Sequence, residues 1–439
     1  MDVSLNHKLI KWYEQILQDW ISPDINIQYS DQHLEIRLPN GKKVKLESSK
    51  INQGVENPLI TLCKVPINSD IAVSEKYVYL ITSSLNLLND LRVEVTSEGV
   101  HVYENILKTL FYYLNRAEEI QSKEVDKFGR FPFKNSISYK THSLQVPVCD
   151  IITQIIKEIC LFLCPKLDLI KTQFSIISTH DVDIPCKYGI SINQSVKSAL
   201  KDIKSKRVEA TISAFLKSHD EYDTFDYIMD KNEEYGNQVF FNFISNPPDR
   251  MGVDPSYSLR HKRIRKCLHH ILSRGHKIGL HAAGGSFQDS GSLDYQIQNL
   301  SNTISDLGSN QCVTHNRFHY LKWSQTTTPN ILSHSNIEVD YTLGFAEKIG
   351  FRCGTGRSYR PFDIYQNKLL NFKVHPMVAM EVSLFHKNYS NLNHDEACDE
   401  ISVTMSQIKK YQYPCVILWH NDKLWNPKDR AVFEYLISY

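Results

Sequence analysis

From about residue 171 onward, the chain alternates short apolar runs with longer segments whose apolar residues recur at helical spacing. The apolar runs predict seven strands, at residues 174–179, 239–244, 277–281, 313–319, 337–341, 372–380 and 415–420. The segments between them predict helices at residues 194–218, 259–274, 294–307, 328–333 and 394–411. Strands that alternate with helices favour a parallel sheet, either wound open or closed into a barrel.

Residues 1–170 follow a different pattern, which predicts a smaller α+β domain ahead of the α/β domain of residues 171–439. Helical spacing appears at residues 5–20, 105–116 and 150–163. Period-two alternation at residues 34–46 predicts a hairpin around the Asn40-Gly41 turn, and residues 77–82 predict a further strand. We find no cluster of reactive residues in this part of the sequence, so its role stays open.

The composition is that of an ordinary globular protein, and it narrows the class of partner. Of 439 residues, 41% are hydrophobic and 23% are charged, and 50 basic residues against 49 acidic ones leave a net charge of +1. This balance does not favour a nucleic-acid partner. No apolar run reaches the ~18 residues of a membrane-spanning helix, and the first residues lack the pattern of a signal peptide. The missing signal peptide argues for the cytoplasm, and the ten scattered cysteines, with no Cys-x-x-Cys pair, agree with it.

Several predicted strands end in residues that can bind a metal or move a proton. These residues are Asp181 and Asp183, His281, Arg317 and His319, and His420. The carboxyl ends of parallel strands meet at one rim, where such proteins build their sites. Residues two apart on a strand share a face, so Asp181 lies beside Asp183, and Arg317 beside His319. The aspartate pair requires a divalent cation or an arginine to offset its repulsion.

Each of these motifs also has a simpler interpretation or a competing one. Asp-x-Asp at residues 181–183 is typical of a surface strand end, and also of glycosyltransferases that hold the metal of a nucleotide sugar. His276 and His281 differ by five positions, so a strand directs only one of them into a site. His281 is the better candidate because it ends the apolar run. His420 also ends an apolar run and can act as a general acid or base, and Asp340 is a candidate to orient it.

Taken together, the motifs resemble those of the polysaccharide deacetylase family, carbohydrate esterase family four. That family has an aspartate pair on its first strand, then Gly-His-Glu-Ile-Gly-x-His, Arg-x-Pro-Tyr and a late Leu-x-His. In the same order this chain has Thr-His-Asp-Val-Asp at 179–183, Gly-His-Lys-Ile-Gly-Leu-His at 275–281, Arg-Phe-His-Tyr at 317–320 and Leu-Trp-His at 418–420. Residues 315–323 and 340–356 are similar to a divergent bacterial subgroup in which an uncharacterised N-terminal domain precedes the barrel.

The resemblance implies an α/β fold of the distorted (β/α)7 barrel type and removal of an acetyl group from an acetamido sugar. It also implies roles in proton transfer. Asp181 resembles the general base, Arg317 the arginine that keeps this base ionised, and His420 the general acid. Asp340 is a looser match to the carboxylate that orients the histidine.

The resemblance further implies a divalent metal held by Asp183 and His281, with zinc expected first and nickel, cobalt or manganese as alternatives. The pattern departs from the family in three ways. Gly285 occupies the position of the usual second histidine ligand, His319 replaces the proline of Arg-x-Pro-Tyr, and the second aspartate is displaced by one residue. Because His319 shares a strand face with Arg317, we expect His319 to supply the missing ligand.

The leading hypothesis is a metal-dependent hydrolase that deacetylates a surface polysaccharide or its lipid- or nucleotide-linked precursor. Proteins of the resembled subgroup tend to be encoded with surface-polysaccharide biosynthesis genes. The alternative is a barrel without catalytic activity that binds a glycan or a biosynthetic partner. Gly285 favours the alternative, whereas Asp181, Arg317 and His420 favour the enzyme, because binding alone requires neither an acid nor a base.

Overall fold

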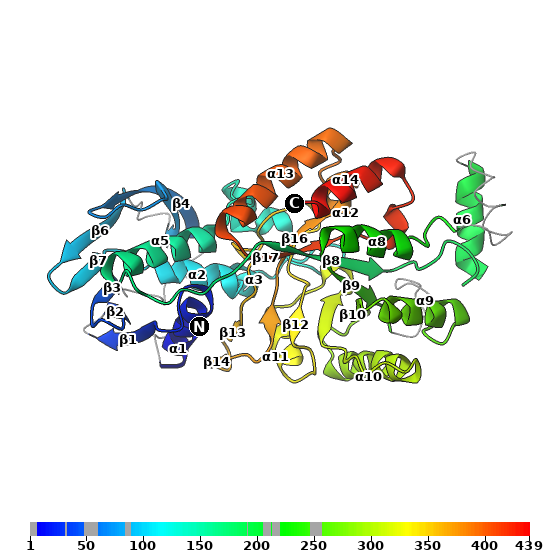
Figure 1. Cartoon of the computed structure of the whole chain (residues 1–439), viewed down its shortest axis with the longest axis horizontal. Coiled ribbons are helices and arrows are strands. Elements are labelled where there is room, and N and C mark those ends of the chain that lie inside the picture. Colours follow the sequence, from blue (N-terminus) through cyan, green and yellow to red (C-terminus); the bar gives the residue numbers. More distant parts are fainter. Residues whose placement is uncertain are drawn as a thin grey trace.

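The computed structural model describes two sheets, one from each part of the chain (Figure 1). In Figure 1 the strands of the first part lie at the left, and those of the second part lie at the centre and right. The described residues are 7–30, 33–47, 60–83, 89–190, 192–204, 212, 220–245 and 257–439.

The larger sheet comes from the second part, and all its strand pairs are parallel. Its strands are β8 (Ser175–Val182), β9 (Gln238–Phe243), β10 (Lys277–Ala282), β11 (His315–Phe318), β12 (Val339–Asp340), β15 (Lys373–Val374), β16 (Met377–Met380) and β17 (Pro414–Leu418). Their spatial order is β15-β12-β11-β10-β9-β8-β17-β16. Each apolar run of the sequence forms a strand, and the run at 372–380 forms both β15 and β16.

The two edges of this sheet belong to one short segment, residues 373–380. Its first part, β15, pairs with β12, and its second part, β16, pairs with β17. The register of β16 shifts between Met377 and Ala379, and an irregularity of this kind bends a strand. The sheet therefore curls until its edges meet in one segment, which confirms the predicted distorted barrel with seven strand positions.

Helices connect the barrel strands, and several cover the outside of the sheet (Figure 1). They are α6 (Ile192–Lys204), α8 (Phe225–Tyr235), α9 (Lys262–Ser273), α10 (Ser290–Asp306), α11 (Thr328–Ser333), α12 (Glu381–Phe385), α13 (His394–Tyr411) and α14 (Pro427–Ile437). Helices α8, α12 and α14 were not predicted. Part of the helix predicted at 194–218 lies outside the described residues. Within the described part of the chain, no helix is both long and apolar enough to span a bilayer.

The N-terminal sheet is mixed and has the order β1-β2-β3-β7-β6-β4-β5. Its strands are β1 (Asn26–Ser30), β2 (His33–Arg37), β3 (Lys43–Glu47), β4 (Ile60–Ser69), β5 (Tyr77–Ser83), β6 (Leu91–Thr96) and β7 (Gly99–Val102). The helices of this part are α1 (His7–Trp20), α2 (Ile106–Leu114), α3 (Ala117–Gln121), α4 (Ile137–Lys140) and α5 (Val148–Leu163). The predicted hairpin is β2–β3, with Gly41 at φ 79° in its turn. Strands β1, β4, β6 and β7 were not predicted.

The two parts of the chain share one continuous hydrophobic core. The Trp12 indole of α1 donates to the Arg360 carbonyl at 2.8 Å, and the Trp20 indole donates to the Ser358 carbonyl at 3.1 Å. Arg352 donates two hydrogen bonds of 2.9 Å from one nitrogen to the Glu119 carboxylate of α3. These contacts, together with the shared core, hold the N-terminal part against the barrel. The boundary between residues 170 and 171 stays a prediction.

Candidate active site

The polar residues expected at the strand ends come from four strands of the barrel. Asp181 is the last residue but one of β8 and Asp183 follows the strand. His281 lies near the end of β10, and Arg317 lies on β11. The His319–Leu321 turn follows β11 directly, and His420 comes two residues after β17. In the sheet, β8 and β11 are separated by β9 and β10. Side chains of β8 and β11 therefore meet only because the sheet curls.

Asp181 is buried, and Arg317 offsets its charge. Its Oδ1 accepts a hydrogen bond from Arg317 Nη1 at 2.9 Å and another from Asn242 Nδ2 at 2.8 Å. Burial by itself raises the pKa of Asp181, but the Arg317 guanidinium and the neighbouring histidines hold that pKa below its ordinary value. Asp181 is thus an ionised carboxylate whose second oxygen faces the His281 ring, 3.7 Å from Nε2.

Asp183, His281 and His319 form a compact group in which each residue offers one ligand atom. These atoms all lie within 4.8 Å of one another. His281 Nε2 lies 3.3 Å from Asp183 Oδ1, and His319 Nε2 lies 3.7 Å from Oδ2. The Oδ1 atom is buried and has no hydrogen-bond partner. Burial raises the pKa of Asp183, but the two histidines bring that pKa well below its ordinary value.

The other ring nitrogen of His281 fixes its orientation. Nδ1 lies 2.8 Å from the Arg317 carbonyl oxygen, which can only accept. Nδ1 therefore carries a proton, and Nε2 is the ring nitrogen directed at Asp183. A second group that orients a metal-binding histidine in this way is a regular feature of metal sites. The group of Asp183, His281 and His319 thus fits a divalent cation.

His319 is held by a tight turn and by a loop from the N-terminal part of the chain. Tyr320, the next residue, has φ 61°, a conformation that non-glycine residues adopt rarely. Its ring stacks on His319 at a centroid distance of 3.9 Å and on Phe128 at 5.1 Å. Arg130 donates to the Tyr320 carbonyl at 3.3 Å. The loop of residues 128–130 therefore supports the turn that carries His319, a role that the sequence did not reveal.

His420 lies on the other side of Asp183 and contacts a glutamate. His420 Nδ1 lies 2.6 Å from Glu381 Oε1, and Nε2 lies 3.8 Å from Asp183 Oδ2. Burial lowers the pKa of His420, but the Glu381 carboxylate and the two aspartates outweigh burial and raise the pKa to about 10. His420 is therefore protonated at neutral pH and can donate a proton from Nε2.

The orienting carboxylate is Glu381, whereas we expected Asp340. Asp340 accepts hydrogen bonds from Asn316 Nδ2 at 2.7 Å, from the Thr342 amide at 2.9 Å and from the Thr342 hydroxyl at 3.0 Å. These bonds direct the Asp340 carboxylate toward β11 and the start of the following loop. The prediction for Asp340 was wrong because the strand-end rule specifies the rim and not which side chains meet.

Two residues of the site, Glu381 and Asn242, were not predicted from the sequence, although the strand-end rule also applies to them. Glu381 comes directly after β16, which is the end of the apolar run predicted at 372–380. Asn242 lies on β9 and faces Asp181. A complete reading of every strand end identifies both. The remaining histidines of the motifs point elsewhere: His180 bonds to the Trp419 carbonyl at 2.7 Å, and His276 pairs with Glu233 at 2.8 Å.

Comparisons with known proteins do not identify the function of this site. Residues 6–165 match a family of unknown function, DUF7033. No curated protein sequence matches the chain significantly. Among solved structures, a protein assigned as a polysaccharide deacetylase from Mycobacterium smegmatis is 12% identical, with a TM-score of 0.41 over 61% of this chain and 83% of its own. The Puue allantoinase is 9% identical, with a TM-score of 0.38 over the same shares.

The backbone at Gly279, in the Gly-His-Lys-Ile-Gly-Leu-His motif, packs closely against the Asn242 side chain. A Cβ at this position would lie 2.3 Å from Asn242 Oδ1. We expect Gly279→Ala to displace Asn242 from Asp181 and to reduce the free energy of unfolding by ~1–3 kcal/mol, the usual cost of overpacking. Urea unfolding followed by circular dichroism measures this change.

Gly285→Ala is the matched control, because a Cβ there meets nothing within 4 Å. Its stability should stay within ~0.5 kcal/mol of the parent. Equal stability of the two alanine variants would contradict the proposed contact.

Proposed function

We propose that this chain is a metal-dependent hydrolase of the polysaccharide deacetylase type that removes acetyl groups from an acetamido sugar. The observation that carries the proposal is the order of groups around Asp183. Two histidines face its carboxylate, the Asp181–Arg317 pair lies on one side, and the His420–Glu381 pair contributes a cationic ring from another strand. A candidate ligand set between an ionised carboxylate and a protonated imidazole has the components of acyl-transfer hydrolysis.

The ligands would be Asp183, His281 and His319, a set of one carboxylate and two imidazoles that suits zinc as well as nickel, cobalt or manganese. When bound, a divalent cation supplies charge that activates water and stabilises the oxyanion of the acyl group. His319 would replace the second histidine ligand, whose usual position is occupied by Gly285. Three protein ligands leave coordination positions for water and substrate.

The chain's own residues divide the proton transfers. Asp181 is ionised and accepts the proton of the attacking water, and Arg317 keeps it ionised through the 2.9 Å bond. His420 starts protonated and delivers a proton to the departing nitrogen, since an amine leaves poorly as an anion. Glu381 stabilises the imidazolium through Nδ1 and leaves Nε2 directed at the reaction centre. Asn242 holds Asp181 in place.

The substrate class rests on the motif resemblance. We propose an acetylated glycan, or its lipid- or nucleotide-linked precursor, in the biosynthesis of a surface polysaccharide. The second candidate function is a barrel without catalytic activity that binds a glycan or a biosynthetic partner, and Gly285 favours it. The two functions differ in one measurable respect, because a binding module has no need of the proton donor His420 or of the base Asp181.

The first prediction from this proposal concerns the metal. Asp183→Ala, His281→Ala and His319→Ala should each lose the equivalent of zinc that the parent binds in the barrel, because each removes one of three ligands. His276→Ala is the matched control from the same motif, since its ring pairs with Glu233 on the outside. Metal analysis after gel filtration measures the content. Full barrel occupancy in all three alanine variants would show that the ligand assignment is wrong.

A second prediction separates proton transfer from metal binding. Asp181→Asn and His420→Ala should lower acetate release from N-acetylated sugars by at least ~10²-fold, the scale of a lost acid–base group. Their zinc content should equal that of the parent, because neither residue belongs to the ligand group. Near-normal turnover in both variants would refute the mechanism, and absence of turnover in the parent would favour the binding module.

A third prediction uses the pKa of His420. A general acid works while it is protonated, so activity should fall as the pH rises through this pKa. Glu381→Gln removes the carboxylate that raises it, and the alkaline limb of kcat should move to lower pH by ~1–3 units. Asp340→Asn is the control, because Asp340 bonds to Asn316 and Thr342. The assignment fails if Asp340→Asn moves the limb and Glu381→Gln does not.

A further inference from the structure

The outer face of the N-terminal sheet gathers charged side chains from β2, β3 and β7. Period-two alternation buries Leu34 and Ile36 of β2, and Val44 and Leu46 of β3, against the core. The residues between them therefore occupy the opposite face, including His33 and Glu47 at the ends of these strands. In the register, His33 lies directly opposite Glu47. On the other side of β3, His101 of β7 lies opposite Lys45, two residues before Glu47.

Most carboxylates described on this face have a lysine or an arginine as partner. Glu35 pairs with Lys43 at 3.2 Å and with Arg37 at 3.0 Å. Glu98 pairs with Lys43 at 3.0 Å and with Lys45 at 3.1 Å. The Glu98 pairs are solvated and contribute little to stability, whereas the Glu35 side chain is buried between its two cationic partners. Glu47 differs from them because it lies against two imidazole rings.

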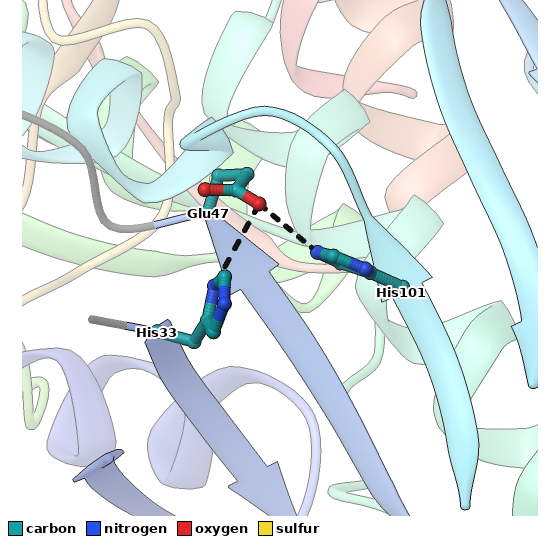
Figure 2. Close-up of side chains that lie close together, drawn as sticks. All are labelled: His33, Glu47 and His101. Carbon is teal, nitrogen blue, oxygen red and sulfur yellow. Dashed lines mark hydrogen bonds and ion pairs between the residues drawn. The ribbon is translucent and has the colours of Figure 1, made fainter. Parts of the chain in front are cut away.

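Figure 2 shows the His33 and His101 rings directed at the Glu47 carboxylate from the two neighbouring strands. His101 Nε2 lies 3.1 Å from Glu47 Oε1, and His33 Nδ1 lies 3.7 Å from the same oxygen. The three ligand atoms fall within 4.8 Å of one another. Two ligands that each lie ~2.1 Å from a tetrahedral zinc are ~3.4 Å apart. The observed separations from Glu47 bracket this value.

Two further features of His33 and His101 favour a bound cation. His33 Nδ1 is buried and makes no hydrogen bond, which is costly for a polar atom and which a metal would relieve. The His101 ring stacks on Tyr103 at a centroid distance of 4.1 Å, and the Tyr103 hydroxyl donates to Glu94. The Tyr103 ring therefore fixes the plane of the His101 imidazole, as the supporting residues of metal sites do.

The electrostatic environment also favours a positive charge. Burial raises the pKa of the Glu104 carboxyl, and the negative charge of Glu47 raises it further. A divalent cation at this group would favour the ionised form of Glu104. Lys108 also lowers the pKa of Glu104, although burial lowers the pKa of Lys108 itself.

We propose that His33, Glu47 and His101 form a second divalent-metal site, selective for zinc-like ions and separate from the barrel. Two imidazoles and one carboxylate suit zinc, whereas calcium and magnesium prefer all-oxygen ligands. The side chains remain 28%, 27% and 18% exposed, so water can complete the coordination. When bound, the ion would join β2, β3 and β7 of the N-terminal sheet. The proximity of the three side chains differs from our expectation that residues 1–170 hold no clustered chemistry.

The experiment uses the whole chain with two of the three proposed barrel ligands replaced, so that the barrel site is incomplete and this site is observed without it. In an Asp183→Asn, His281→Gln background, we expect about one equivalent of zinc per chain by titration calorimetry and by metal analysis after gel filtration. His33→Gln, Glu47→Gln and His101→Gln, each added to this background, should lose that equivalent at the same zinc concentration. Cobalt, which reports the ligand field by visible absorption, should show a spectrum in the background that vanishes in the three variants.

His270→Gln is the matched control, because the His270 ring pairs with one carboxylate, Asp226, on an exposed helix of the barrel. It should leave binding unchanged. Failure of the barrel to bind metal would remove zinc from the parent barrel only and would leave the background equivalent intact. A background protein that binds no zinc, or whose binding survives all three substitutions, overturns the proposal.

A measurement without substitutions at the site guards against misfolded variants. Diethyl pyrocarbonate modifies accessible imidazoles, and peptide mass spectrometry locates the products. Zinc added to the background protein should protect His33 and His101 and should leave the modification of His270 unchanged. Equal modification of His33 and His101 with and without zinc would also overturn the proposal, whatever the variants do.

Discussion

The burial of negative charge at one rim is the constraint on which the site depends. Asp181 is 2% exposed and Arg317 is fully buried, so neither charge is tolerable without the other. Their side chains come from strands that are not neighbours in the sheet, and only the curl of the sheet brings them together. The short segment at residues 373–380, which closes the sheet, therefore also determines whether the charges meet. The same segment leads directly into Glu381, the partner of His420.

Histidine side chains, in addition to Arg317, offset the negative charge of the two aspartates. Asp183 is held ionised by His281 and His319, and Glu381 keeps His420 protonated. Neighbouring groups with opposite protonation are the usual requirement for acid and base to work at one pH. Asp183 Oδ1 and Arg317 Nη2 are both buried without a hydrogen-bond partner, which costs free energy. A cation at Asp183 would give its free oxygen a partner.

The N-terminal part of the chain contacts the barrel close to the candidate site. Phe128 and Arg130 support the turn that presents His319, and Glu119 pairs with Arg352 in the shared core. Substitutions that disturb the packing of this part would therefore also disturb the barrel. The His33, Glu47 and His101 group lies on the sheet's opposite, charged face. The proposed metal site there would be independent of the barrel.

The sequence by itself determined the periodic features. Apolar runs located all the barrel strands, because a strand buried on both faces is a continuous apolar run. Strand ends then located Asp181, Asp183, His281, Arg317, His319 and His420, because parallel strands place their carboxyl ends on one rim. Tertiary structure alone decided which of these side chains meet. The carboxylate at His420 is Glu381 and not Asp340. His33 and Glu47 face each other at the end of the predicted hairpin, but His101 reaches them from 54 residues further along the chain. Register and curl bring such residues together, and both depend on packing across the whole sheet, which no local pattern records.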